Sequence, residues 1–121
     1  MSDKEANRDI RDYLNDISEM IGDIEDFTVD ISYQDFERDK KTLYAVIRCF
    51  EVVGEAVKQI PNHIREEHPE IPWKGLAGMR DKLIHGYFGV DIRIVWDTIE
   101  EDLPPLKEAV RDVLFRLSLM R

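Results

Sequence analysis

The chemically richest stretch of the chain lies between residues 80 and 87, where an arginine, an aspartate, a histidine and a tyrosine occur close together. An arginine presents permanently charged, forked donors that match phosphate oxygens, and a histidine titrates near neutral pH and can exchange protons with hydroxyl groups. Such a pair can cleave RNA without a metal if His85 acts as base on the 2′-hydroxyl or acid on the 5′-oxygen, while Arg80 stabilises charge developing on phosphorus. Asp81 could orient either residue. Because DNA lacks the 2′-hydroxyl nucleophile, these residues predict RNA rather than DNA as substrate.

The spacing of Arg80 and His85 places a condition on this chemistry. The two residues are five helical steps apart, which is about 140° around a helix axis, so an unbroken helix would direct them apart. Two arrangements would bring them together. Either the helix unwinds before His85, as Gly86 and Gly89 allow, or two copies of the segment meet across a dimer. On spacing alone, ion pairing or helix capping explains these residues more readily than catalysis does.

Length and composition limit the classes to which the chain can belong. Its 121 residues are one domain's length, expected to span residues 1–121. A content of 43% hydrophobic and 36% charged residues, with 6 Gly and 5 Pro, favours an ordered, helix-rich globule. The single cysteine excludes an internal disulfide, and no run approaches the roughly 20 apolar residues of a membrane-spanning helix. The start of the chain also lacks a signal peptide's apolar core, so a cytoplasmic protein is expected.

Charge is unevenly distributed along the chain. The formal net charge is −9, and residues 1–39 carry all of this excess, with 13 acidic and 4 basic side chains. A strongly acidic protein is usually repelled by nucleic acid. Between residues 72 and 94, however, four basic side chains outnumber two acidic ones: Lys74, Arg80, Lys82 and Arg93 against Asp81 and Asp91. A locally cationic site is therefore compatible with the acidic whole.

Two long helices are predicted in the first half of the chain. Apolar residues recur at spacings of three and four, which predicts an amphipathic helix from about residue 5 to 27, with acids on its solvent face. Ser32 or Asp35 is placed to cap a second helix that begins near Phe36 and runs to Pro61. Its apolar surface is unusually wide, because the main stripe is joined by Tyr44, Ala45, Cys49, Val52 and Ala56. One side is expected to face the core and the other a second subunit. Cys49 is expected to be a packed thiol.

The connection PNHIREEHPEIP predicts at most one or two helical turns. Its His63 and His68 are five residues apart and lack the i, i+4 spacing of a helical zinc pair, so both are interpreted as exposed connector residues. With a single cysteine and no Gly-rich phosphate loop, no metal and no cofactor are expected.

The second half of the chain predicts a short helix and a long one. The short helix begins near Trp73 and fades around Ile84, and Asp91 caps the last helix, which starts at Ile92. Apolar residues keep a heptad rhythm from there to Met120, even through Pro104 and Pro105. A proline pair normally stops or kinks a helix, so the preserved phase predicts two nearly coaxial halves or one kinked helix.

These elements predict an all-α fold: an antiparallel bundle of four main helices with one short extra helix. Trp73 and Trp96 stand at helical spacing among apolar residues and are interpreted as packing anchors.

The sequence resembles the HepT-like branch of the HEPN superfamily, whose members are toxin partners of minimal nucleotidyltransferases. The resemblance lies in RCFEVVGEAVKQIP and in IPWKGLAGMRDKLIHGYFGVDIRIVWDTIEEDLPPL, and it spans roughly residues 8 to 117. The family signature is Arg, four to six residues, His, one residue and Tyr. Here it falls on Arg80, His85 and Tyr87.

The resemblance implies a HEPN-type homodimer in which the two motif segments line a cleft between subunits and act as a metal-independent endoribonuclease. Arg80 and His85 would be the catalytic pair, with Asp81 as the polar residue that follows the arginine. Tyr87 would accept AMP from the cognate nucleotidyltransferase antitoxin, which neutralises the toxin, since a bulky anionic group beside the cleft would repel RNA. Glu55 lies where the family repeats an acid and is interpreted as an ion-pairing or dimer-contact residue.

Two other hypotheses remain open at this stage. The chain could be a noncatalytic dimer that binds a nucleotidyltransferase and accepts AMP, a hypothesis that the net charge of −9 favours slightly. It could also be a helical scaffold with no chemistry.

Overall fold

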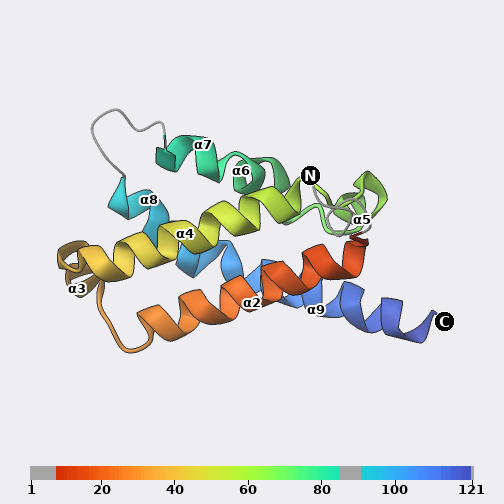
Figure 1. Cartoon of the computed structure of the whole chain (residues 1–121), viewed down its shortest axis with the longest axis horizontal. Helices are drawn as coiled ribbons and strands as arrows, with labels where there is room; N and C mark the ends of the chain where they lie inside the picture. Colours follow the sequence, from red (N-terminus) through yellow and green to blue (C-terminus); the bar gives the residue numbers. More distant parts are fainter. Residues whose placement is uncertain (1–7, 85–90, 121) are drawn as a thin grey trace.

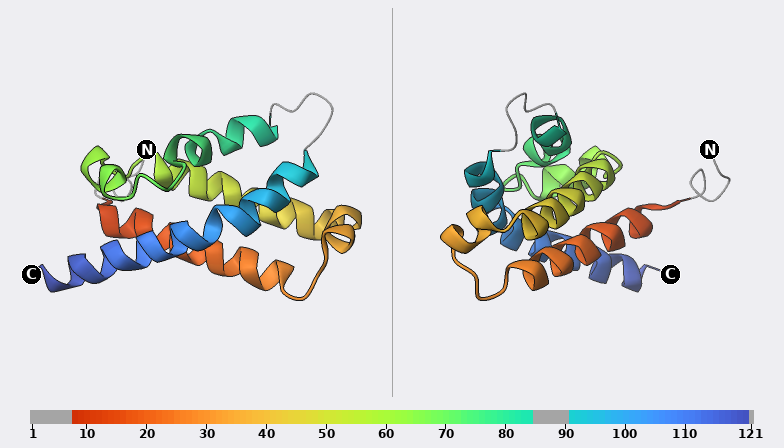
Figure 2. Two further views of the ribbon diagram at one scale, coloured as in Figure 1. Left: turned by 180° about the vertical axis from the view of Figure 1, so that it is seen from behind. Right: turned by 60° about the vertical axis from the view of Figure 1, so that its left-hand side comes forward.

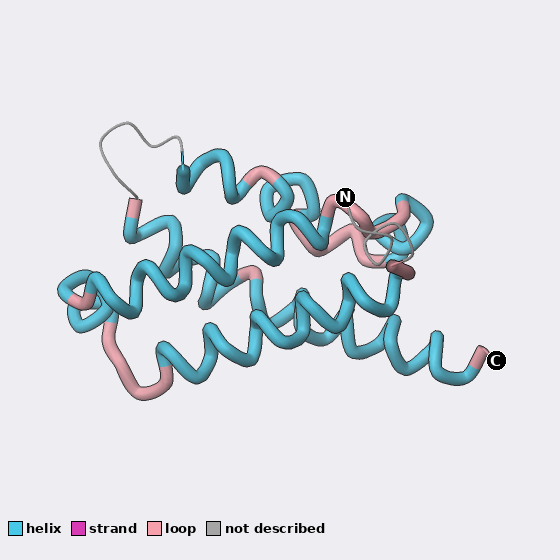
Figure 3. The backbone as a smooth tube through the Cα atoms, in the orientation of Figure 1, coloured by secondary structure: helices cyan, strands magenta, loops and turns pink. Residues whose placement is uncertain are grey.

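The computed structural model describes residues 8–84 and 91–120, with the backbone alone at Arg80 and Ile84. Within these ranges the chain consists of helices joined by short turns, without a strand (Figures 1 and 3). The helices are α2 (Ile10–Thr28), α3 (Tyr33–Arg38), α4 (Lys40–Val57), α5 (Asn62–Glu67), α6 (Trp73–Ala77), α7 (Met79–Ile84), α8 (Ile92–Glu101) and α9 (Leu103–Leu119). The predicted all-α fold is confirmed. None of these helices is both long and apolar enough to cross a membrane.

The three longest of these helices, α2, α4 and α9, form the body of the bundle. Helix α4 runs antiparallel to α2, and α9 packs on α2 and also runs in the opposite direction to it (Figures 1 and 2). Helices α6 and α7 pack on α4, running antiparallel to it. The antiparallel order expected from the sequence is therefore present, and α7, which contains Arg80, lies against α4.

The hydrophobic core follows the three-and-four spacing of the apolar residues. In α2 the side chains of Leu14, Ile17, Ile21 and Ile24 are at most 1% exposed, and in α4 those of Val46, Phe50, Val53 and Val57 are fully buried. Burying one such side chain stabilises the fold by roughly 1.5–3 kcal/mol. Most acids of α2, including Asp12, Glu19 and Glu25, are exposed, as predicted, whereas Asp16 and Asp23 are half-buried.

Local capping moves the predicted helix boundaries in the first half of the chain. Helix α2 begins at Ile10 rather than near residue 5, because Asp9 is extended and forms a capping box with Asp12. Ser32 caps α3, in agreement with one of the two predicted alternatives. The predicted second helix is divided at Asp39, whose carboxylate accepts hydrogen bonds from the backbone and side chain of Thr42 and so starts α4. These hydrogen bonds hold the pKa of Asp39 below its usual value.

The wide apolar surface predicted for α4 is only partly covered by the chain itself. Cys49 and Ala56 are buried in the core, and Ala45 and Val52 are half-buried. Tyr44, in contrast, is 61% exposed. The outer face of α4 therefore presents an aromatic side chain and partly covered apolar residues to its surroundings.

The proline pair falls where a helix tolerates it. Helix α8 ends at Glu101, Asp102 keeps helical backbone angles, and α9 begins at Leu103 with Pro104 and Pro105 in its first turn. Amide groups in the first turn have no intrahelical partner, so the prolines cost no hydrogen bond there. The two helices follow one another in the same direction (Figure 2, left), as the preserved phase predicted. The apolar heptad series that begins at Ile92 is at least partly buried except at its last member, Met120, which is 71% exposed.

Helices α4 and α6 approach each other closely at Gly54. A Cβ atom at this position would lie 3.1 Å from the carbonyl oxygen of Leu76 and 3.4 Å from that of Ala77. Those oxygens belong to the backbone of α6, and a helix backbone cannot move aside as the flexible end of a side chain can. The absence of a side chain at Gly54 therefore lets α6 lie directly on α4.

Replacing Gly54 by alanine is expected to destabilise the protein, although alanine normally favours a helix over glycine by about 1 kcal/mol. The new methyl group must push α6 away, and overpacking of this kind costs about 1–3 kcal/mol. Gly22 in α2 is the matched control, because a Cβ there meets no atom within 4 Å. Urea unfolding should show G22A at least as stable as the native protein and G54A less stable. Equal stabilisation by both substitutions would contradict this role for Gly54.

Candidate functional site

The connector between α4 and α6 fixes where the motif segment begins. Arg65 of α5 donates hydrogen bonds to the carbonyl oxygens of Val57 at 2.7 Å and Ile60 at 3.0 Å, which satisfies acceptors at the end of α4. The indole nitrogen of Trp73 donates to the carbonyl oxygens of Arg65 and His68, and its side chain is 8% exposed. Trp73 is thus a packing anchor, as predicted, and it ties the start of α6 to the connector.

The helix predicted over residues 73–84 is divided at Gly78 into α6 and α7. Helix α7 is held against α4 by Met79 and Leu83, which lie four residues apart on one face and are 4% and 6% exposed. Arg80 follows Met79 directly in the first turn of α7, and the side chain of Asp81 is exposed. The core contacts of α7 therefore set the backbone position of the predicted catalytic arginine.

The other end of the motif segment is fixed by a helix cap. The carboxylate of Asp91 accepts hydrogen bonds from the backbone nitrogens of Arg93 at 3.1 Å and Ile94 at 3.2 Å, which confirms it as the cap of α8. His85 and Tyr87 lie outside the described residues. The convergence of Arg80 and His85 stays a prediction, and the structure supplies the two anchored helices, α7 and α8, between which that segment runs.

The cationic surface predicted around the motif is mixed in sign. Lys74, Lys82 and Arg93 are exposed, and so are Asp81 and Asp91. The guanidinium of Arg93 pairs through Nε with Asp97 at 3.2 Å. Among exposed groups, each cation here has an acid within a few residues of sequence, so this surface would attract an anionic ligand only weakly at long range.

An aromatic cluster lies where α3 meets α8. Phe36 is fully buried and its ring centroid lies 5.2 Å from that of Trp96. Tyr33 meets Trp96 edge to face at 5.9 Å, and the guanidinium carbon of Arg93 lies 4.7 Å from the centre of the Tyr33 ring. Trp96 is a packing anchor, as predicted. The pairing of Tyr33 with Arg93 was not predicted, because the two residues are 60 positions apart and no local spacing connects them.

The histidines of the connector do not form a metal site. His63 is exposed, as expected, but the prediction was wrong for His68, whose ring lies between Glu70 at 3.6 Å and Asp112 at 3.7 Å with Nε2 buried. The error arose because α9 covers this side of the connector, a long-range contact. Over residues 8–84 and 91–120, no group of three or more His, Cys, Asp or Glu side chains is arranged to hold a metal ion.

Two further predicted residues take structural roles. Cys49 is 5% exposed, and burial raises the pKa of its thiol, which disfavours the reactive thiolate. Glu55 is exposed on α4 and pairs with Lys58 at 3.4 Å. Both observations agree with the sequence interpretation of a packed thiol and an ion-pairing acid.

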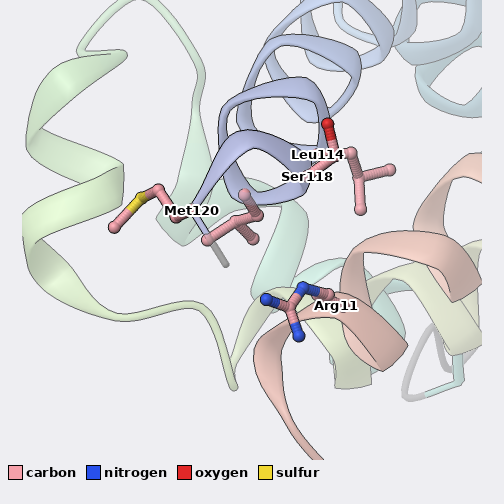
Figure 4. Close-up of a pocket in the computed structure, with 5 residues that line it drawn as sticks. Arg11, Leu114, Ser118 and Met120 are labelled. Atoms are coloured by element: carbon pink, nitrogen blue, oxygen red, sulfur yellow. The ribbon is translucent and has the colours of Figure 1, made fainter.

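A surface cavity of about 430 Å³ lies away from the motif, at the end of α9 (Figure 4). Its lining is Arg11 of α2 together with Leu114, Leu117, Ser118 and Met120. In this lining only Arg11 and the Ser118 hydroxyl could contact a phosphate, and no carboxylate or imidazole is present to act as an acid or a base. This cavity therefore lacks the groups that acid–base chemistry needs.

Comparison with known proteins identifies the family of this chain. The family described as "Ribonuclease HepT-like" matches residues 17–113, a range that includes α7, α8 and the segment between them. No solved structure matches the chain significantly.

Several relatives are similar over most of their length. "Probable ribonuclease HepT" of Thermococcus cleftensis is 58% identical over 100 residues, which cover 83% of this chain and 91% of the relative. "Putative RNase MJ0125" of Methanocaldococcus jannaschii is 52% identical over 107 residues, covering 88% of this chain and 92% of the relative. With this similarity and its all-α fold, the chain belongs to the HepT-like ribonucleases of the HEPN superfamily.

Proposed function

We propose that the protein is a metal-independent endoribonuclease in which Arg80 and His85 act on one phosphodiester at a cleft between two subunits. The observation that carries the proposal is the coincidence of the Arg80, His85 and Tyr87 spacing with the family match, on a segment anchored at α7 and α8. The relatives are named as ribonucleases, which supports RNA as the substrate.

The chemistry is an intramolecular displacement within the RNA. The 2′-oxygen attacks the adjacent phosphorus, and the 2′-hydroxyl proton passes to the catalytic general base. The bond from phosphorus to the 5′-oxygen then breaks, and the 5′-oxygen takes up a proton. The products are a 2′,3′-cyclic phosphate and a 5′-hydroxyl. His85 serves as the proton-transfer group, and Arg80 stabilises the negative charge that builds on the phosphoryl oxygens. Asp81, exposed beside Arg80 in α7, is assigned an orienting role.

The outer face of α4 supports a homodimer. It presents exposed Tyr44 and half-buried Ala45 and Val52, and an apolar helix face of this kind is usually covered by another surface. Helix α7 packs on the same helix. A second copy docked on α4 would therefore bring two motif segments towards each other.

Purified protein is expected to cleave single-stranded RNA in the presence of EDTA and to leave cyclic phosphate ends. The substitution His85→Ala should lower the rate at least about 100-fold, because general acid–base catalysis contributes about 10²–10⁴-fold. His63→Ala, which removes an exposed connector histidine, is the control and should cut normally. Circular dichroism and light scattering establish that each variant keeps its fold and oligomeric state. Full activity of H85A would exclude the proposed mechanism.

The proposal includes regulation by a nucleotidyltransferase antitoxin encoded nearby. The phenolic oxygen of Tyr87 attacks the α-phosphorus of ATP and loses its proton, and pyrophosphate leaves. The attached AMP adds bulk and negative charge beside the motif, and both oppose RNA binding. The net charge of −9 makes a protein-binding role plausible alongside the nuclease.

Intact-mass spectrometry after incubation with that enzyme and ATP should show the addition of at least one AMP group. Tyr87→Phe should abolish the addition because it removes the accepting oxygen. Tyr44→Phe is the matched control, since Tyr44 is an exposed tyrosine outside the motif, and it should still be modified. Persistence of the mass gain in Y87F would place the modification elsewhere. If AMP is added to a native protein that has no nuclease activity in EDTA, the noncatalytic alternative holds.

A further inference from the structure

The pairing of Arg93 with Tyr33 has features of a nucleotide-binding surface. The guanidinium lies over the Tyr33 ring at 4.7 Å, and this ring is supported from behind by Trp96, which packs on fully buried Phe36. The aromatic row thus runs from the core to the surface and ends at a cation. A guanidinium in cation–π contact with one ring can still offer the rest of its surface to a base, and its edge suits a phosphate.

The high exposure of the Arg93 side chain distinguishes it from an arginine whose contacts serve only to stabilise the fold. The chain contains a second set of the same residue types, in which Arg8 lies 4.8 Å over Tyr13 and bonds Asp16 at 2.6 Å. The side chain of Arg8 is 31% exposed, whereas that of Arg93 is 62% exposed. In the Arg93 set the contact with Asp97 is longer, with Nε 3.2 Å from the carboxylate. Much more of the guanidinium of Arg93 is therefore accessible to a ligand.

The two sets also differ in their distance from the motif. Arg93 is the second residue of α8, six positions after Tyr87, and six residues of chain span at most about 20 Å. Helix α3, which begins at Tyr33, lies at the same end of the bundle as α8, whereas α2, which begins two residues after Arg8, starts at the opposite end (Figure 1). RNA cleaved at the motif would therefore extend within reach of Arg93.

We propose that Tyr33 and Arg93 form a binding site for the RNA nucleotides that flank the cleaved bond. A base stacks on the exposed face of the Arg93 guanidinium, and Tyr33 holds that group in place from below. This inference rests on the proposed function and adds a substrate-binding surface to it. Single-stranded RNA is the ligand that fits, because unpaired bases offer faces for stacking and duplex RNA does not.

The charges at this end favour stacking over electrostatic attraction. Exposed cations occur at Arg38, Lys40 and Lys41, but exposed acids at Asp35, Glu37 and Asp39 accompany them. Few counterions would be released from RNA on binding. The contribution of Arg93 should therefore persist at raised salt.

The test measures RNA binding separately from cleavage. Fluorescence anisotropy with a short fluorescein-labelled single-stranded RNA is recorded for H85A, which keeps the RNA intact, and for the same protein carrying R93Q or R8Q. R93Q should weaken binding on the order of tenfold, because one stacked base contributes about 1–3 kcal/mol. R8Q, which removes the equivalent arginine at the other end, should bind like H85A alone. Equal affinity of R93Q and R8Q would overturn the proposal.

A second pair of substitutions separates binding from folding. Tyr33→Phe keeps the ring beneath the guanidinium and should retain affinity, whereas Tyr33→Leu removes the ring and should lose it. Urea unfolding shows whether Y33L is still folded under the assay conditions.

In the background with His85 intact, R93Q should raise KM and leave kcat largely unchanged. A fall in kcat alone would contradict a binding role. If the native protein fails to cleave RNA and H85A fails to bind it, the proposed function itself is wrong. If R93Q cleaves and binds RNA normally, only the proposed binding site at Tyr33 and Arg93 is excluded, and the ribonuclease proposal stands.

Discussion

Helix α6 lies on α4 at a distance that a glycine at position 54 permits, and the location of the motif follows from that contact. The carbonyl oxygens of Leu76 and Ala77 occupy the space that a Cβ of residue 54 would need. Helix α7 continues from α6 and is held on α4 by Met79 and Leu83. Any displacement of α6 would move α7 with it, and the backbone of Arg80 would shift relative to the rest of the bundle.

A phosphodiester-cleaving site needs groups placed within fractions of an ångström, and rigid helices are better suited to this than loops. The motif segment leaves α7 and enters α8, and both helices have independent anchors: core side chains for α7 and the Asp91 cap for α8. The start of α8 is also stabilised by the packing of Trp96 on Phe36. The same packing brings Tyr33 of α3 to Arg93 of α8, so one arrangement holds both the proposed RNA contact and the helix that follows the motif in sequence.

The sequence predicted the elements whose signals are local. The apolar spacing of α2, the Asp91 cap and the continuation of α8 into α9 follow from neighbouring residues and were confirmed. The helix breaks at Asp39 and Gly78 were not predicted, because the apolar spacing continues on both sides of each break. At Asp39 the helix is interrupted by capping, and at Gly78 the chain divides into α6 and α7, which both pack on α4. The position of His68 beneath α9 and the stacking of Arg93 on Tyr33 join residues far apart in sequence, and no periodicity reports such contacts. For the site, the candidate residues came from the sequence, and the packing of α7 on α4 and the Asp91 cap of α8 came from the structure.

The central claim is that Arg80 and His85 act together on one phosphodiester. Its most direct test is a double-mutant cycle on RNA cleavage in EDTA, comparing kcat/KM for the native protein, R80A, H85A and the combined variant. Residues that serve the same transition state are strongly non-additive. The account predicts that each single substitution removes most of the activity and that the double variant is about as slow as the slower single one. Independent, multiplicative losses, or near-native cleavage by either single variant, would contradict it.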